Sequence, residues 1–72
     1  MEEVWIRDAY IKLGQAMKLG GLSGSGVDAK MVIQDGLVRV NGDVCTMRGK
    51  KIYDGDIISF GGEEICIRMK SS

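Results

Sequence analysis

The chain lacks histidine and proline, and among its 72 residues it has only two cysteines, one tryptophan, two tyrosines and one phenylalanine. Because histidine is the commonest acid–base group in enzymes, its absence counts against a catalytic site. Cys45 and Cys66 do not form a C-x-x-C pair, and a structural zinc site without histidine would need unusual carboxylate ligands. We therefore expect no catalytic residue, no cofactor and no metal, and we interpret both cysteines as small buried hydrophobic residues in strands.

Long apolar runs are also missing. A membrane-spanning helix needs about 20 mostly apolar residues, and no stretch of the chain comes near that. The first ten residues, MEEVWIRDAY, are acidic and lack the apolar core of a signal peptide. We expect a cytoplasmic protein with no membrane partner. The length predicts one domain, residues 1–72, with a modest core, and we expect it to be a monomer.

The first third of the chain predicts a strand and then a helix. Residues 3–8, EVWIRD, are rich in β-formers and predict a short strand. Residues 11–21, IKLGQAMKLGG, change to the helical period, with Leu13, Ala16, Met17 and Gly20 on one face. Gly20 and Gly21 provide the stop, since glycine accepts the left-handed conformation at a helix end.

A second helix is predicted after the small residues GLSGSG. Ser25 is a good N-cap, and Asp28 stands three residues later as its capping-box partner. The apolar face of this helix is predicted to contain Ala29, Val32, Ile33 and Gly36.

Beyond Gly36 the apolar period becomes two, which predicts strands. Val38 and Val40 would face the core, and Asn41-Gly42 is a strong hairpin signal. Asp54-Gly55 and Gly61-Gly62 predict further turns around the strands DIISF and EEICIRM, and we interpret Asp54 and Asp56 as residues of a solvated turn. The fold class is therefore α+β, with two packed helices on a small, mostly antiparallel twisted sheet of four to five short strands. The predicted core contains Leu13, Met17, Leu19, Val32, Ile33, Val38, Val40, Ile58 and Ile67.

The charges are unevenly spread although the formal net charge is zero. Residues 12–51 contain seven basic and three acidic residues, so this segment carries +4 and the two ends together carry −4. Three of the basic residues lie in the run RGKK, at Arg48, Lys50 and Lys51. A phosphate-binding face requires such asymmetry. A solvated face of mixed charge explains the same pattern equally well.

Residues 13–60 resemble the RNA-binding domain named after ribosomal protein S-four, also called the alpha-L motif. The matching features are the leucines at Leu13 and Leu19, Ala29-Lys30, the G-x-V-x-V-N-G element from Gly36 to Gly42, and D-G-D-I-I from Asp54 to Ile58. The short length and the R-G-K-K-I-Y element resemble the free-standing bacterial members of the YbcJ and YaaA kind.

The resemblance implies that the helix pair and the adjoining loop form a surface for structured RNA, recognised mainly through its phosphates. Ribosomal or transfer RNA is the implied target, and a ribosome or a ribosomal assembly intermediate the implied partner. The implied contact residues are Lys12, Lys18, Ser25, Lys30, Arg39, Arg48, Gly49, Lys50 and Lys51.

This chain departs from the family in one respect, because many members place arginine after the serine that begins the second helix. Here Gly26 and Val27 follow Ser25. A protein-interaction adaptor of the same fold, with weak RNA binding, therefore stays open as an alternative. A DNA-binding helix-turn-helix is disfavoured, because the second helix has one lysine and two aspartates. Trp5 and Tyr53 are interpreted as core or rim residues rather than a base-stacking platform.

Overall fold

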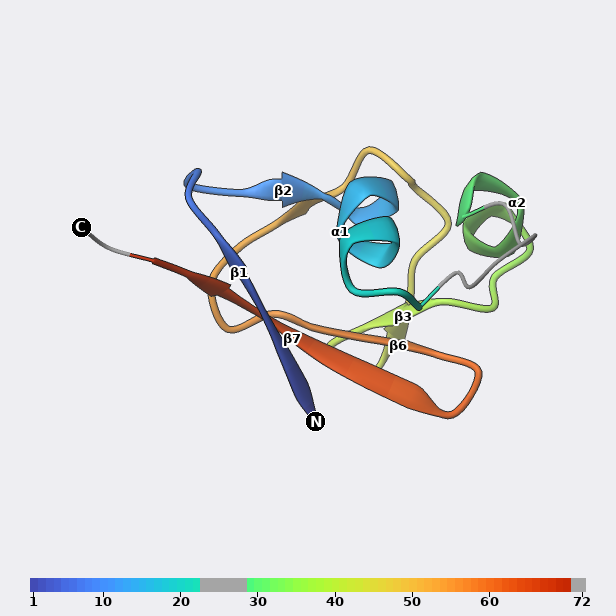
Figure 1. The fold of residues 1–72 in the computed structure, drawn as a ribbon. Helices are drawn as coiled ribbons and strands as arrows, with labels where there is room; N and C mark the ends of the chain where they lie inside the picture. The colour runs from blue at the N-terminus through green and yellow to red at the C-terminus, as the bar shows by residue number, and fades with distance from the viewer. Residues whose placement is uncertain (23–28, 71–72) are drawn as a thin grey trace.

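Two helices lie over one face of a twisted sheet in the computed structural model, which describes residues 1–22 and 29–70 (Figure 1). The elements are β1 Glu2–Ile6, β2 Ile11–Lys12, α1 Leu13–Leu19, α2 Ala29–Gln34, β3 Arg39–Val40, β4 Asp43–Val44, β5 Lys51–Ile52, β6 Ile57–Phe60 and β7 Glu63–Met69. The α+β class is thus confirmed. The predicted N-cap Ser25 and its partner Asp28 lie outside the described residues.

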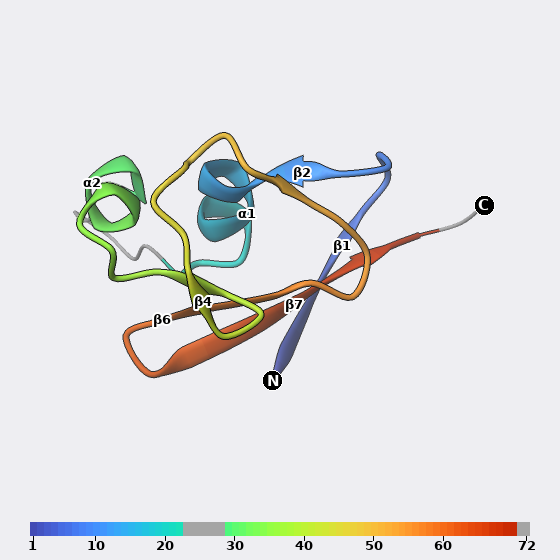
Figure 2. The ribbon, with the colours of Figure 1, turned by 180° about the vertical axis from the view of Figure 1, so that it is seen from behind.

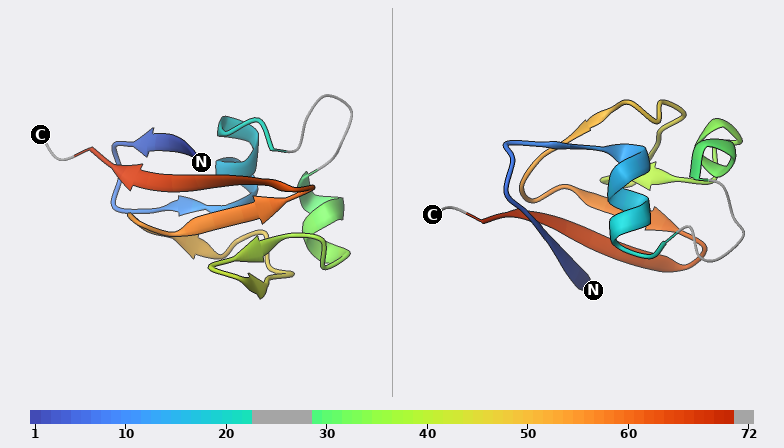
Figure 3. Two further views of the ribbon diagram at one scale, coloured as in Figure 1. Left: turned by 90° about the horizontal axis from the view of Figure 1, so that it is seen from below. Right: turned by 45° about the horizontal axis from the view of Figure 1, so that its top comes forward.

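The main sheet has five strands in the order β1-β7-β6-β3-β4. The β3–β4, β3–β6 and β6–β7 pairs are antiparallel, whereas β1 pairs with β7 in parallel, with Val4 opposite Ile67. The sheet is therefore mixed and mostly antiparallel, and the strand predicted near the N-terminus forms one of its edges. The views from behind and from below show both helices on the same side of this sheet (Figures 2 and 3).

One part of the predicted arrangement is wrong. Ile11 and Lys12 do not begin the first helix, and the segment around Ile52, for which no pairing was predicted, lies outside the main sheet. They form a separate two-stranded ribbon, β2–β5, with Ile11 opposite Ile52 and Lys12 opposite Lys51. Ile52 is fully buried. The reason is tertiary, since this pairing joins residues far apart in the sequence, and local periodicity carries no signal of it.

Eight of the nine predicted core residues are buried, and the exception is Leu19, which is 60% exposed. The core also contains residues that were not predicted, namely Val4, Ile6, Leu22, Ile52 and Ile65. The buried face of α1 consists of Leu13, Ala16 and Met17. Leu19 follows Leu13 by six residues, which is about 240° around a helix, so it points away from that face. On α2, Ala29, Val32 and Ile33 are buried as predicted.

The predicted turns are confirmed by their backbone angles. Asn41 and Gly42 have φ values of 52° and 87°, and Val40 pairs with Asp43 across the turn. Positive φ at both positions is what a tight two-residue hairpin of the primed type requires. Gly61 and Gly62 likewise have positive φ, between the paired residues Phe60 and Glu63.

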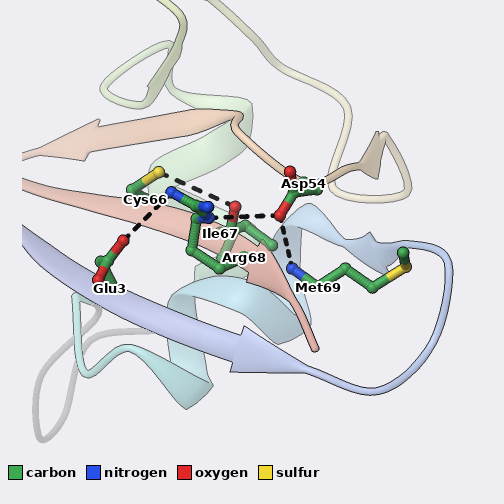
Figure 4. Close-up of polar contacts among 6 residues, drawn as sticks. All are labelled: Glu3, Asp54, Cys66, Ile67, Arg68 and Met69. Atoms are coloured by element: carbon green, nitrogen blue, oxygen red, sulfur yellow. Dashed lines mark hydrogen bonds and ion pairs between the residues drawn. The ribbon is translucent and has the colours of Figure 1, made fainter. Parts of the chain in front are cut away.

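The carboxylates of Asp54 and Asp56 fasten the turn that leads from β5 to β6. Oδ2 of Asp56 accepts a hydrogen bond from the backbone N–H of Tyr53 over 2.8 Å. Oδ1 of Asp54 accepts one from the N–H of Met69 over 2.8 Å and lies 3.4 Å from Nε of Arg68 (Figure 4). Both side chains thus have structural partners.

Both cysteines are free thiols and half-buried, so the prediction of two buried strand residues is correct only in part. Cys66 lies in β7, between the buried Ile65 and Ile67, and alternation along a strand turns it to the outer side. Cys45 follows β4 and packs against the edge of the core. Across residues 1–22 and 29–70, no group of three or more His, Cys, Asp or Glu side chains could hold a metal ion, and no helix is long and apolar enough to cross a membrane.

Candidate functional site

A hollow of about 400 Å³ opens between the start of α1, the start of α2 and the loop that joins β4 to β5. We call it the basic hollow. Its lining residues are Lys12, Gly14, Gln15, Lys18, Ala29, Lys30, Arg48 and Gly49. Among the described residues, this lining includes four cations and no carboxylate. The four cations come from β2, α1, α2 and the β4–β5 loop, and all are exposed.

The backbone of the β4–β5 loop holds Arg48 beside α1. The N–H of Gly14 donates to the carbonyl of Arg48 over 3.1 Å, and the N–H of Leu13 donates to the carbonyl of Lys50 over 2.9 Å. These are first-turn N–H groups that have no partner inside a helix. The side chain of Lys12, at the N-cap, makes no capping hydrogen bond. The loop therefore caps α1 and in return is fixed against it.

Gly14 is one of the two residues of α1 that the loop contacts through backbone hydrogen bonds. A Cβ built on Gly14 would lie 3.8 Å from both Cβ and the carbonyl oxygen of Arg48, which is ordinary van der Waals contact. A Cβ on Gly49 would meet no atom within 4 Å. Any larger side chain at Gly49 would therefore project into open space.

Three of the cations that line the basic hollow form no ion pair with a described residue. Within the described part of the chain, none of Lys12, Lys18 and Arg48 has an ion-pair partner; the two ion pairs found there both belong to Arg68. Cations held together in a concave surface raise the local positive potential and attract anions. This arrangement suits a ligand that carries several negative charges.

The basic run RGKK does not act as one cluster. Arg48 lines the basic hollow, but Lys50 lines a separate hollow of about 440 Å³ that also contains Asp43 of the β3–β4 hairpin. The Lys51 ammonium lies over the ring of Tyr10, 4.9 Å from its centroid. The three charges therefore point to three different surroundings.

Arg39 also lies away from the basic hollow. Its neighbour Val40 is buried beneath the helices, so alternation along β3 turns Arg39 to the outer face of the sheet. Ser25, another implied contact residue, lies outside the described residues. Of the nine implied residues, the structure brings five together at this hollow, namely Lys12, Lys18, Lys30, Arg48 and Gly49.

Sequence reasoning did not include Gly14, Gln15 and Ala29 among the contact residues, although all three line the hollow. Gly14 did carry a signal, because a glycine inside a helical pattern costs up to about 1 kcal/mol relative to alanine and usually has a packing or functional reason.

Residues 4–68 match the model of the family described as S4 domain. The chain belongs to the S4 domain family. The resemblance seen in the motifs is thereby confirmed over nearly the whole chain.

This S4 domain is also similar to two curated bacterial proteins. One, from Escherichia coli strain K12, is named "Putative RNA-binding protein YbcJ" and is 39% identical over 56 residues, which cover 78% of this chain and 80% of that protein. The other, from Shigella flexneri, is named "Uncharacterized protein YbcJ" and has the same identity and coverage.

Proposed function

We propose that this S4 domain is a non-catalytic protein that binds structured RNA, and that the basic hollow contacts the phosphate backbone. The observation that carries the proposal is the convergence of four cations, without a carboxylate among the described lining residues, in a chain of zero net charge. The name of the Escherichia coli relative supports RNA as the polyanion.

The chemistry of the lining suits phosphates. An arginine guanidinium can hold one phosphate through two parallel hydrogen bonds, as Arg48 would, whereas lysines such as Lys12 and Lys18 act as movable point charges. Folded RNA presents phosphates in A-form geometry, with a major groove too narrow for side chains to read. Recognition by shape and charge follows, and we propose ribosomal or transfer RNA, free or in a ribosomal assembly intermediate, as the target.

A salt titration tests the proposal. Each phosphate contact should contribute roughly 0.7–0.9 to the slope of log affinity against log salt concentration. For an RNA hairpin, the double variant Lys18→Gln/Arg48→Gln should flatten this slope by about 1.5 and weaken binding most at low salt. The matched control Arg39→Gln/Lys70→Gln removes the same charge outside the hollow and should change the slope much less.

The adaptor alternative gives a different result. If the wild-type chain does not bind RNA hairpins at low salt, RNA binding is excluded and a protein partner, bound in a salt-tolerant way, becomes the better interpretation. If both double variants flatten the slope equally, RNA binding is diffuse and the basic hollow is not the site.

A further inference from the structure

The β2–β5 ribbon carries the same three residue types in mirrored order. Tyr10-Ile11-Lys12 runs antiparallel to Lys51-Ile52-Tyr53, with Ile11 opposite Ile52 and Lys12 opposite Lys51. Extending this register by one residue places Tyr10 opposite Tyr53, and their ring centroids are indeed 6.0 Å apart. Because side chains alternate along a strand, the isoleucines turn to the core while both tyrosines and both lysines share the outer face.

This outer face is open to solvent. Tyr10 is 38% exposed and Tyr53 48% exposed, and their rings are inclined to each other by 49°. Tyr53 is thus a rim residue, as the sequence suggested. The Lys51 ammonium lies over the Tyr10 ring. A pair of half-exposed aromatic rings next to a cation is the combination that binds a base and its phosphate in proteins that contact unpaired nucleotides.

Lys12 connects the tyrosine pair to the basic hollow. Lys12 lines the hollow and is the cross-strand partner of Lys51. Tyr10 precedes Lys12 by two residues, which is about 6.5 Å along a strand. A nucleotide chain leaving the hollow past Lys12 would therefore reach the rings within about one nucleotide.

We propose that the tyrosine pair stacks one unpaired nucleobase that flanks the paired segment held in the basic hollow. The base lies on Tyr53 with Tyr10 beside it, and Lys51 and Lys12 face the phosphate of that nucleotide. The inference rests on the proposed function and adds to it that the RNA ligand contains a junction between paired and unpaired nucleotides. It also revises the interpretation of Tyr53 as a core or rim residue rather than part of a base-stacking platform.

Three versions of one RNA hairpin separate base stacking from phosphate binding. The first is blunt, the second carries one unpaired adenosine, placed at the 5′ end or at the 3′ end, and the third carries an abasic nucleotide in the same place. Stacking on an aromatic side chain should make the adenosine hairpin bind at least about fivefold more tightly than the abasic one. At one of the two ends, 2-aminopurine in place of the adenosine should lose fluorescence on binding.

Two substitutions at Tyr53 test whether its ring causes the preference for adenosine over the abasic nucleotide. Tyr53→Leu should abolish the preference for adenosine over the abasic nucleotide while leaving the affinity for the blunt hairpin and its salt slope unchanged. Tyr53→Phe keeps the ring and should retain the preference. Both variants should melt near the wild-type temperature, since the side chain is half exposed.

The failures of the two proposals are distinguishable. If the blunt hairpin binds in a salt-dependent way but the adenosine and abasic hairpins bind equally at both ends, phosphate binding stands and the stacking inference is overturned. Retention of the preference in Tyr53→Leu overturns it as well. If the wild-type chain binds none of the hairpins, the proposed function and this inference are both excluded.

Discussion

The side-chain amide of Asn41 donates from Nδ2 to Oδ1 of Asp56 over 3.1 Å, which joins the β3–β4 turn to the turn that precedes β6. The same amide accepts, through Oδ1, a hydrogen bond from the N–H of Ile57 over 2.9 Å. Asn41 also has the left-handed backbone, with φ of 52°. The N-G element at Asn41 and the D-G-D element at Asp54 to Asp56 are therefore joined by side-chain hydrogen bonds, and together they stabilise the sheet.

Two substitutions at Asn41 should separate these contributions. Asn41→Gly keeps the left-handed backbone but removes both side-chain hydrogen bonds, which should lower the free energy of unfolding by about 1–2 kcal/mol. Asn41→Ala should be less stable by about another 1 kcal/mol, because alanine is strained at positive φ. Urea denaturation measures both. An alanine variant as stable as the glycine variant would show that the backbone conformation contributes nothing.

The two ends of α1 should respond in opposite ways to the same change. At Gly14 an added Cβ has ordinary contacts, so Gly14→Ala should leave stability unchanged or raise it by up to about 1 kcal/mol. At Gly20 the added Cβ would lie 2.6 Å from Cδ1 of the buried Ile65 and 3.3 Å from the carbonyl of Ala16. Gly20→Ala should therefore cost about 1–3 kcal/mol. Thermal melts of the two variants that coincide would contradict this packing.

Truncations on the two helices test the assignment of the core. Ile33 is fully buried, and Ile33→Ala should cost about 2–5 kcal/mol, comparable with the whole stability of a domain this small. Leu19→Ala removes a 60% exposed side chain and should change stability by less than about 0.5 kcal/mol. Circular dichroism at room temperature suffices, because the Ile33 variant should be largely unfolded. A Leu19 variant that unfolds equally would place that side chain in the core.

Local signals in the sequence predicted most of the fold. The alternation at Val38 and Val40 and the paired turn residues Asn41-Gly42 depend only on neighbours in the chain, and the structure confirms them. Leu19 shows where a single-residue inference failed. Helical spacing from Leu13 placed it off the apolar face, but its hydrophobicity and its place in the family pattern argued for burial.

The features that escaped prediction depend on contacts between distant segments. The start of α1 is capped by carbonyls of Arg48 and Lys50, which no local capping pattern reveals. The β2–β5 ribbon arises in the same way, although the mirrored triplets YIK and KIY are visible in the sequence. The run RGKK identified the positive charges in the sequence. The directions of their side chains could not be predicted, because they depend on how the β4–β5 loop is fixed to α1.

Arg48 and Lys50 are nearly adjacent in the run RGKK but line different hollows, so substitutions at these two positions should affect RNA binding differently. Arg48→Gln and Lys50→Gln each remove one positive charge, and they lie two positions apart in the same loop. Arg48 lines the basic hollow, whereas Lys50 lines the other hollow together with Asp43. Arg48→Gln should flatten the salt slope for an RNA hairpin by roughly 0.7–0.9, and Lys50→Gln should change it by much less.

Neither substitution should affect folding, because the loop is attached to α1 through its backbone carbonyls and both side chains are exposed. A thermal melt of each variant checks this before RNA is added, so a change in slope can be assigned to binding. Lys51→Gln completes the series, because it removes the ammonium that lies over the ring of Tyr10. It should weaken the adenosine hairpin more than the blunt one. Equal slopes for the Arg48 and Lys50 variants would mean that RNA responds to the net charge of the loop, and the directions of its side chains would then have no part in recognition.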